Sequence, residues 1–481
     1  MNQDNSTSST SKDERSTFSK VVETGFLILT WLALSSYTEI YGPTLIDLKL
    51  KLNANYEDVA IATSGRSYGW FPGSIVGGLL VDKFGGYCHL MIAVALDMAA
   101  GATMAIPLVH NVTYTWVFCF IGGCMESILN IAGTRIVFNI WKEKSVSPLM
   151  LIHLGYGIGS FIVPLYSNPF LADELHVSQN ITNIEGKSTS TSFPWNNTTS
   201  EPTYGTSRIE YAYGISTAIV ASLSIVFYVY QIRRSQASLK IDPHDVKTGA
   251  ASVEGEPKRK TVLEMINPAT CANGRMFYGM QILFLIFLYF GNLGGGDRMI
   301  GSFIRSYSVD QLHFSKTSAS LINTAYWISF SIGRLLFSVI SRFVSVRVLL
   351  IVQATGMAVS STLLMFLADD DSLSFWIIIQ GFAFFSSSTW PTGVAWTDYH
   401  IELTGLGMTW QILGASVGGI CHLRLIGYLY EHVGPISFLY QTLGYGVSTL
   451  IIAVSLNLVG CQHGSRLQGQ EEKEIAVSTI T

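Results

Sequence analysis

Residues 64–86 read SGRSYGWFPGSIVGGLLVDKFGG, an apolar run that contains a single arginine and ends in a polar turn. Its glycines at positions 65, 69, 73 and 77 recur every fourth residue, so a helix places all four on one face. A face of glycines lets the backbone of a neighbouring helix approach closely, as it does in membrane proteins. The stretch therefore predicts a tightly packed helix that ends near Asp82.

The composition excludes an ordinary soluble enzyme. The chain has 481 residues, of which 49% are hydrophobic and 13% are charged, whereas soluble proteins carry about 25% charged residues. Apolar runs of roughly 20 residues, long enough to cross a bilayer, recur twelve times. They lie near residues 21–43, 57–81, 87–107, 114–141, 147–170, 210–232, 275–300, 318–340, 347–368, 375–396, 405–428 and 437–460. We see no nucleophile–base pair, metal-ligand cluster or phosphate loop, so we do not expect an enzyme.

The basic residues between these runs set the predicted orientation. With the N-terminus inside, 18 Lys and Arg residues lie on the cytosolic side and 6 on the outer side, so both termini are expected in the cytosol. The long outer loop at 171–209 carries glycosylation sequons at Asn180, Asn196 and Asn197. The first twenty residues are polar, which argues against a cleavable signal peptide. No cysteine lies in an outer loop, so we expect no disulfide framework.

The chain is expected to divide into two six-helix halves. A polar tail (1–20) precedes the first half (21–232), a basic linker (233–274) separates it from the second half (275–460), and a further tail (461–481) follows. The end of the eighth run, Gly333-Arg334 followed by Ser341-Arg342, weakly repeats the end of the second run. Internal repeats of this kind are typical of secondary transporters.

Ionisable residues inside the predicted membrane spans are the best candidates for function. Glu126 lies near the middle of the fourth run, and Asn130 follows one helical turn later on the same face. We expect an unpaired carboxyl that couples to a cation, the alternative being a structural pair with an arginine of a neighbouring helix. Arg66 in the outer half of the second run needs an acidic partner, and by depth Glu39 is the first candidate and Asp297 the second.

Two segments predict irregular helices. Asn292-Leu293-Gly294-Gly295-Gly296 in the seventh run predicts either a broken helix at an outer gate or a loop that starts at residue 292. Pro391 predicts a kink in the tenth run.

The ending Gly78-x-x-x-Asp82-Lys83-x-Gly85 resembles the loop between helices 2 and 3 of the major facilitator superfamily. The resemblance implies an all-α polytopic membrane protein with twelve transmembrane helices in two six-helix halves. It also implies a cytosolic latch between the halves, in which Asp82 faces the start of helix 11 near Thr404 and Gly405. The residues assigned to this latch are Asp82, Lys83, Gly85, Gly333 and Arg334.

Further motifs resemble one branch of that superfamily, the sodium-dependent glucose transporter and facilitator-superfamily domain-containing 4 group. The motifs are Gly42-Pro43-Thr44, Pro169-Phe170-Leu171, Tyr326-Trp327, Pro391-Thr392-Gly393 and Gly414-Ala415-Ser416-x-Gly418. The branch is distantly similar to fucose–proton symporters, in which a Glu-x-x-x-Asn of helix 4 carries proton coupling, and Glu126 and Asn130 match it. The chain departs from that pattern at Asn292, at Gly418-Gly419 and within Cys421-His422-Leu423.

The expected function is secondary active transport of a small polar solute by alternating access, coupled to sodium or protons, and the resemblance implies a hexose such as glucose. Residues of the types that bind sugars are Gln281, Asn323, Tyr326, Trp327, Gln380, Trp390 and Gln411. The alternative is a non-transporting membrane receptor or scaffold on the same fold. We expect no cofactor other than the coupling cation, no nucleic-acid partner, a monomer in the lipid bilayer, and a plasma-membrane or endolysosomal location.

Overall fold

The computed structural model describes residues 17–141, 146–175, 203–239, 272, 274–368, 371–401 and 405–463. In this part of the chain the structure is helical apart from two short antiparallel strands, β1 (Glu174–Leu175) and β2 (Thr203–Tyr204). The predicted glycosylation sites Asn180, Asn196 and Asn197 lie between these strands and outside the described residues.

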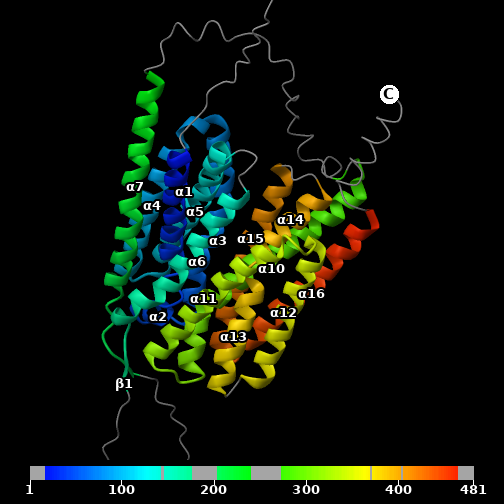
Figure 1. Cartoon of the computed structure of the whole chain (residues 1–481). Coiled ribbons are helices and arrows are strands. Elements are labelled where there is room, and N and C mark those ends of the chain that lie inside the picture. The colour runs from blue at the N-terminus through cyan, green and yellow to red at the C-terminus, as the bar shows by residue number, and fades with distance from the viewer. Residues whose placement is uncertain are drawn as a thin grey trace, which may run out of the picture.

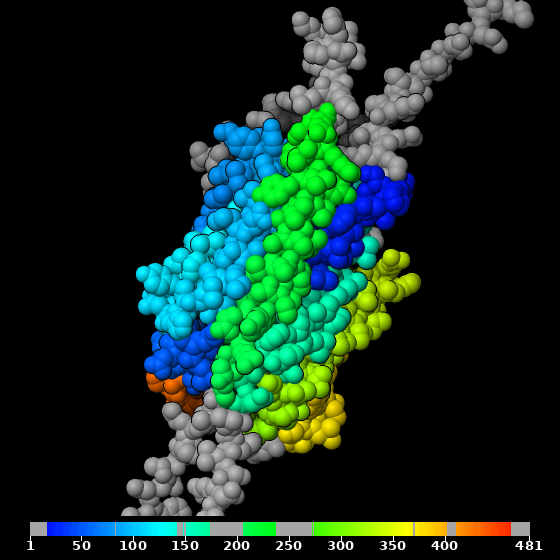
Figure 2. Space-filling view, turned by 90° about the vertical axis from the view of Figure 1, so that its left-hand side faces the viewer, coloured from blue at the N-terminus to red at the C-terminus, as the bar shows by residue number. Residues whose placement is uncertain are grey.

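The helices before residue 240 form one bundle, here called the N-terminal half. They are α1 (Thr17–Thr38), α2 (Leu45–Leu52), α3 (Tyr56–Lys83), η1 (Gly85–Tyr87), α4 (Cys88–Ala105), η2 (Ile106–Leu108), α5 (Val112–Trp141), α6 (Val146–Ser167), η4 (Asn168–Phe170) and α7 (Ile209–Leu239). The side chain of Asn55 caps α3 by accepting a hydrogen bond from the Asp58 amide at 2.7 Å. Figure 2 shows α7 crossing the outside of this bundle, where it packs on α1 and α4.

The helices after residue 275 form the C-terminal half. They are α10 (Met276–Asp310), α11 (Lys316–Ile340), α12 (Val346–Leu367), α13 (Ser372–Ser386), α14 (Thr389–His400), α15 (Gly405–His432) and α16 (Ser437–His463). Each of the twelve predicted spans corresponds to one helix of the two halves or, for 375–396, to the pair α13 and α14. The helix is interrupted between α13 and α14 at Ser387 and Ser388, just before Pro391, where the proline predicted a kink.

The two halves stand side by side (Figure 1), with α3 packed on α15 and α6 packed on α11. The start of α1 and the end of α16 lie at the same end of the molecule, and β1 lies at the other end (Figure 1). The basic residues predict that the first end is cytosolic and the second end is the outer one, and these names are used below.

The glycine face of α3 packs against α5, which confirms the prediction from residues 64–86. A β-carbon at Gly65, Gly69 or Gly73 would lie 2.3, 2.0 and 2.5 Å from the carbonyl oxygens of Trp116, Phe120 and Cys124, respectively. These partners also recur every fourth residue, so the two backbones run in contact over several turns.

The prediction of a break or loop at residue 292 was wrong, because α10 runs without interruption from Met276 to Asp310. Its glycines fit close to neighbouring helices instead. A β-carbon at Gly294 would lie 2.8 Å from Cβ of Ala415, and one at Gly296 would lie 2.4 Å from the ring of Tyr445. Close packing against α15 and α16 offsets a helix-propensity cost of about 1 kcal/mol per glycine.

The surface is that of a protein in lipid. Eight helices in the described residues are long and apolar enough to cross a membrane. Large apolar side chains are exposed around the bundle, among them Leu79, Ile225, Phe284, Phe366 and Leu458. A soluble monomer rarely exposes so much contiguous apolar surface. The chain is therefore an integral, multi-pass membrane protein.

Candidate functional site

Arg66 of α3 lies between two carboxylates in the interior of the N-terminal half. Its Nε and Nη2 donate to the two carboxylate oxygens of Glu126 at 2.7 and 3.0 Å, which is a bidentate pair. Its Nη1 donates to the Thr38 carbonyl at 3.1 Å and lies 3.5 Å from Oε1 of Glu39. Arg66 and Glu126 are 8% and 5% exposed, so this pair is removed from solvent. Buried charges of this kind persist only when they are paired and hydrogen-bonded.

Glu39 follows the last residue of α1 and reaches the boundary between the halves. The hydroxyl of Tyr156 on α6 donates to its Oε1. A β-carbon at Gly301 of α10 would lie 3.0 Å from its Oε2 and 3.3 Å from the ring of Trp327. Glu39 therefore joins the Arg66–Glu126 pair to the C-terminal half. One guanidinium faces two carboxylates, which leaves this cluster with one negative charge when both are ionised.

The structure brings Arg66 to Glu39, its first predicted partner, but Glu126 is closer. The expectation that Glu126 is an unpaired carboxyl was wrong, because α3 and α5 pack so closely that Arg66 reaches it. Asn130 does not extend this pair, since its amide donates to the backbone carbonyl of Glu126 at 2.9 Å. The four side chains Glu39, Arg66, Glu126 and Tyr156 are called the N-terminal cluster below.

Asp297 and Arg298 of α10 form a second charged site at the boundary. Tyr445 donates its hydroxyl to Asp297 at 2.9 Å. Arg298 crosses to the N-terminal half, where it donates to Oγ of Ser67 at 2.5 Å and lies 5.0 Å above the ring of Trp70. Asp297 and Arg298, which are neighbours on one helix turn, thus have partners in opposite halves. Asp297 accepts a hydrogen bond from Tyr445 and is not the partner of Arg66.

Several of the predicted solute-binding residues lie beside these charges. Trp327 packs edge-to-face on Tyr156 with ring centroids 6.5 Å apart, and Tyr326 packs on Trp327 at 5.4 Å. Trp390 lies 6.3 Å from Trp70 across the boundary. Asn323, one turn before Trp327, is fully buried, and neither end of its amide has a hydrogen-bond partner among the described residues. A buried amide without partners is costly unless water or a ligand satisfies it.

The three predicted glutamines lie farther away. Gln380 accepts a hydrogen bond from Ser329 at 2.9 Å, between α13 and α11. Gln411 is buried in the first turns of α15, and its Nε2 has no partner among the described residues. Gln281 lies about 25 Å before Arg298 along α10, by the rise of an α-helix.

The predicted latch residues fall into two groups. Lys83 is exposed above the Phe84 ring, whereas the Asp82 side chain and residues 402–404 lie outside what the structure describes, so their contact stays a prediction. Gly333 packs against the Phe384 carbonyl. Arg334 donates to the carbonyls of Ser387 at 2.9 Å and of His153 at 3.2 Å. It therefore ties α11 to α6 of the other half.

The outer ends of the two halves are joined directly. Oδ2 of Asp310 at the end of α10 accepts hydrogen bonds from Tyr56 of α3 at 2.5 Å and from Tyr430 of α15 at 2.9 Å. The Tyr56 amide also donates to Glu431 at 2.9 Å, and Lys316 pairs with Asp173 at 2.8 Å. These contacts join the two halves at the outer end.

Sequence reasoning did not single out Arg298, Ser67 or Tyr156 as site residues. Arg298 stood beside Asp297 in a segment interpreted as a possible loop, and a continuous helix would have placed it in the membrane interior, where an arginine is costly. Among the described residues, no three His, Cys, Asp or Glu side chains form a metal-ligand group.

Comparisons with known proteins agree with this fold. A model for the Major Facilitator Superfamily matches residues 26–420. The chain is 22% identical over 434 residues to Sodium-dependent glucose transporter 1 of Homo sapiens, covering 89% of this chain and 77% of that protein. It is 22% identical over 462 residues to Major facilitator superfamily domain-containing protein 4A of Mus musculus, covering 86% and 87%.

Two solved structures share the fold at low identity. The inward open xylose transporter XylE from E. coli has a TM-score of 0.61 at 12% identity, covering 91% of this chain and 95% of that one. The transporter FucP in its outward conformation has a TM-score of 0.56 at 15% identity, covering 91% and 99%. The matches confirm the resemblance drawn from the sequence motifs, and the relatives are transporters rather than enzymes.

Proposed function

The chain belongs to the Major Facilitator Superfamily, and we propose that it is a secondary active transporter that moves a hexose such as glucose by alternating access, coupled to sodium or protons. The observation that carries the proposal is the buried N-terminal cluster, in which Glu39 and Glu126 share the guanidinium of Arg66 at the boundary between the two halves. Solute sites of secondary transporters lie between their repeats near the middle of the bilayer.

The charge of the cluster supports coupling to a cation. Glu126 is held by two short hydrogen bonds, whereas Glu39 has a 3.5 Å contact with the same guanidinium and a hydroxyl donor. A proton or a sodium ion on Glu39 would change the charge of the cluster without breaking the Arg66–Glu126 pair. Because intramembrane ionisable residues are costly, such a charge is expected to have a function.

The polar and aromatic groups near the cluster support a hydroxylated solute. Asn323 has both amide atoms free of partners among the described residues, and the ring nitrogen of Trp70 and the hydroxyl of Tyr37 are also buried without a partner there. Trp327 and Trp390 supply aromatic faces. A sugar offers hydroxyls for such groups and an apolar ring face for tryptophan. Glucose and sodium come from the name of the relative in Homo sapiens.

The remaining assignments belong to the same proposal. Asp82, Lys83 and Gly85 would form a cytosolic latch with the start of α15, and Gly333 and Arg334 would belong to the same latch, which the contact of Arg334 with His153 of the other half supports. Both termini would be cytosolic, and Asn180, Asn196 and Asn197 would be glycosylated on the outer side. The protein would act as a monomer, at the plasma membrane or in endolysosomal membranes.

A counterflow assay in proteoliposomes tests the proposal. Vesicles loaded with one unlabelled hexose at a time are diluted into the same labelled hexose, with and without a sodium gradient and a pH gradient. We expect accumulation for at least one hexose and dependence on one of the two gradients. Absence of exchange for every hexose, with correctly inserted protein, would contradict hexose transport and favour the receptor or scaffold hypothesis.

A further inference from the structure

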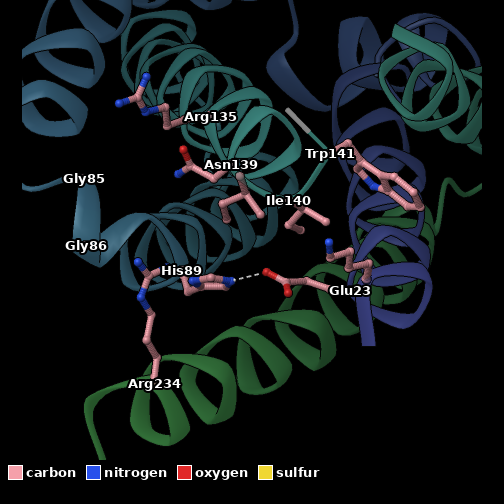
Figure 3. Close-up of a pocket in the computed structure, with 11 residues that line it drawn as sticks. Glu23, Gly85, Gly86, His89, Arg135, Asn139, Ile140, Trp141 and Arg234 are labelled. Atoms are coloured by element: carbon pink, nitrogen blue, oxygen red, sulfur yellow. Dashed lines mark hydrogen bonds and ion pairs between the residues drawn. The ribbon is translucent and has the colours of Figure 1, made fainter. Parts of the chain in front are cut away.

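A pocket of about 450 Å³ opens at the cytosolic end of the N-terminal half, away from the boundary between the halves. Four helices meet there. Lys20 and Glu23 come from the start of α1, His89 from the start of α4, Arg135 and Asn139 from the end of α5, and Arg234 from the end of α7 (Figure 3). None of these residues belongs to the N-terminal cluster or to the proposed solute site.

The lining of the pocket is positively charged. Lys20, Arg135 and Arg234 contribute three positive charges, and Glu23 is the only acidic residue among those that line it. Oε1 of Glu23 lies 2.8 Å from Nε2 of His89. Apart from His89, the charged side chains that line the pocket in the described part of the chain are therefore three basic groups and one acidic group. Figure 3 shows Arg234 extending from α7 toward His89, and Arg135 and Asn139 following one another along α5.

His89 is held rigidly in this wall. It is 3% exposed, and its ring stacks on Tyr230 with centroids 5.6 Å apart. Its Nδ1 is buried and has no hydrogen-bond partner among the described residues. His89 therefore belongs to the rigid wall of the pocket, where it holds the carboxylate of Glu23.

The backbone adds to the preference for an anion. Gly85 and Gly86 of η1 line the pocket immediately before α4 begins at Cys88. The positive end of the α4 dipole follows these glycines and favours a phosphate there.

The surroundings of the pocket indicate where such an anion comes from. Exposed apolar side chains flank the residues that line the pocket: Val21 beside Lys20, Leu90 beside His89 and Ile232 close to Arg234 are 54%, 36% and 56% exposed. A lipid whose acyl chains cover these side chains places its headgroup at the pocket. Basic pockets at the cytosolic ends of membrane helices are suited to phosphorylated headgroups.

We propose that this pocket binds the phosphate groups of an anionic membrane lipid headgroup, a phosphoinositide by its size and charge. The phosphates lie between Arg135 and Arg234, beside Gly85 and Gly86. Binding at this place joins the cytosolic ends of α1, α4, α5 and α7. The proposal does not depend on which solute the protein transports.

The test is lipid binding to the full chain in nanodiscs of phosphatidylcholine with increasing phosphatidylinositol 4,5-bisphosphate. Arg135→Gln and Arg234→Gln are each expected to weaken binding about 5-fold, since a basic residue near the headgroup contributes about 1 kcal/mol. Arg233→Gln is the matched control, because Arg233 is exposed beside Arg234 and does not line the pocket. It is expected to change the affinity less than about 2-fold. Unchanged thermal unfolding of each variant shows that it is folded.

Two results would overturn the proposal. Equal weakening by Arg233→Gln and Arg234→Gln would show attraction to a basic surface and no defined site. A second arm uses plain phosphatidylcholine nanodiscs and soluble glucose 6-phosphate. If that compound binds there and loses affinity in Arg234→Gln, and if it also displaces phosphatidylinositol 4,5-bisphosphate in the first arm, the pocket binds a soluble phosphate ester and the lipid assignment is wrong.

Discussion

The pairing of Arg66 predicts an asymmetry that a double-mutant cycle can measure. Arg66→Met keeps the length of the side chain but leaves Glu126 and Glu39 without a guanidinium. Removing one partner of a buried ion pair costs about 3–5 kcal/mol of unfolding free energy. Glu126→Gln is expected to cost less, about 1.5–3 kcal/mol, which is the range for hydrogen bonds to charged groups. Arg66 then still has Glu39 at 3.5 Å and the Thr38 carbonyl at 3.1 Å.

The double variant Arg66→Met/Glu126→Gln removes both charges of the bidentate pair. Its unfolding free energy should therefore be higher than the sum of the two single losses predicts. The difference is the coupling energy, about 0.5–3 kcal/mol for residues in contact. Unfolding of the purified protein in mixed micelles, followed by tryptophan fluorescence, measures all four corners of the cycle. Arg342→Met, at an exposed arginine, serves as the control and should change stability by less than about 0.5 kcal/mol.

Two results would refute this reasoning. Additive losses in the double variant would mean that Arg66 and Glu126 do not interact in the folded protein. A smaller loss for Arg66→Met than for Glu126→Gln would mean that Glu39 does not share the guanidinium, and the charge argument for a bound cation would fail with it.

Three further predictions follow from single contacts. Gly69→Ala should lower the unfolding free energy by about 1–3 kcal/mol by overpacking, because its β-carbon would lie 2.0 Å from the Phe120 carbonyl. Gly78→Ala on the same helix, with nothing within 4 Å, should not destabilise, and equal losses would contradict the α3–α5 contact. Asp310→Asn should weaken the outer contact with Tyr56 and Tyr430 and lengthen the distance between spin labels on the outer ends of α3 and α15. An unchanged distance distribution would show that this contact does not hold the outer ends of the two halves together. Glu39→Gln and Glu126→Gln should each abolish concentrative uptake of the solute in proteoliposomes but leave its exchange, because each variant removes one negative charge from the cluster. If concentrative uptake survives in a variant, the residue changed in it does not take part in coupling.

The sequence predicted features that depend on one helix or on the steric demands of one face. Glycines every fourth residue specify close approach whatever the partner is, so the packed face of α3 could be inferred without knowing that α5 covers it. Pro391 likewise disturbs only its own helix, which is interrupted just before it. Apolar length is also a local property, and it located the membrane spans.

The features that could not be predicted depend on how two helices are aligned. Depth in the membrane made Glu39 the first candidate partner for Arg66, but the register between α3 and α5 brings Glu126 closer. One residue in the sequence reflects this alignment. Gly123 precedes Glu126 by three residues, and a β-carbon there would lie 2.0 Å from the Arg66 carbonyl. The glycines of α10 led to a wrong prediction of a break or loop, because packing between helices was left out. Their propensity cost was counted without the helices that pack against them.

The contacts of the N-terminal cluster give Glu126 and Glu39 different roles. Glu126 and Arg66 satisfy each other through two hydrogen bonds and bury their charges against α5, so a cation that binds Glu126 must first break that pair. Glu39 has only the longer contact with Arg66, and it touches Gly301 and lies near Trp327 in the other half. A cation on Glu39 changes the charge at the surface where the halves separate, whereas one on Glu126 acts deep inside a single half. Coupling a cation gradient to alternating access needs the charge to change at that surface, which makes Glu39 the residue where cation and solute can act on the same boundary.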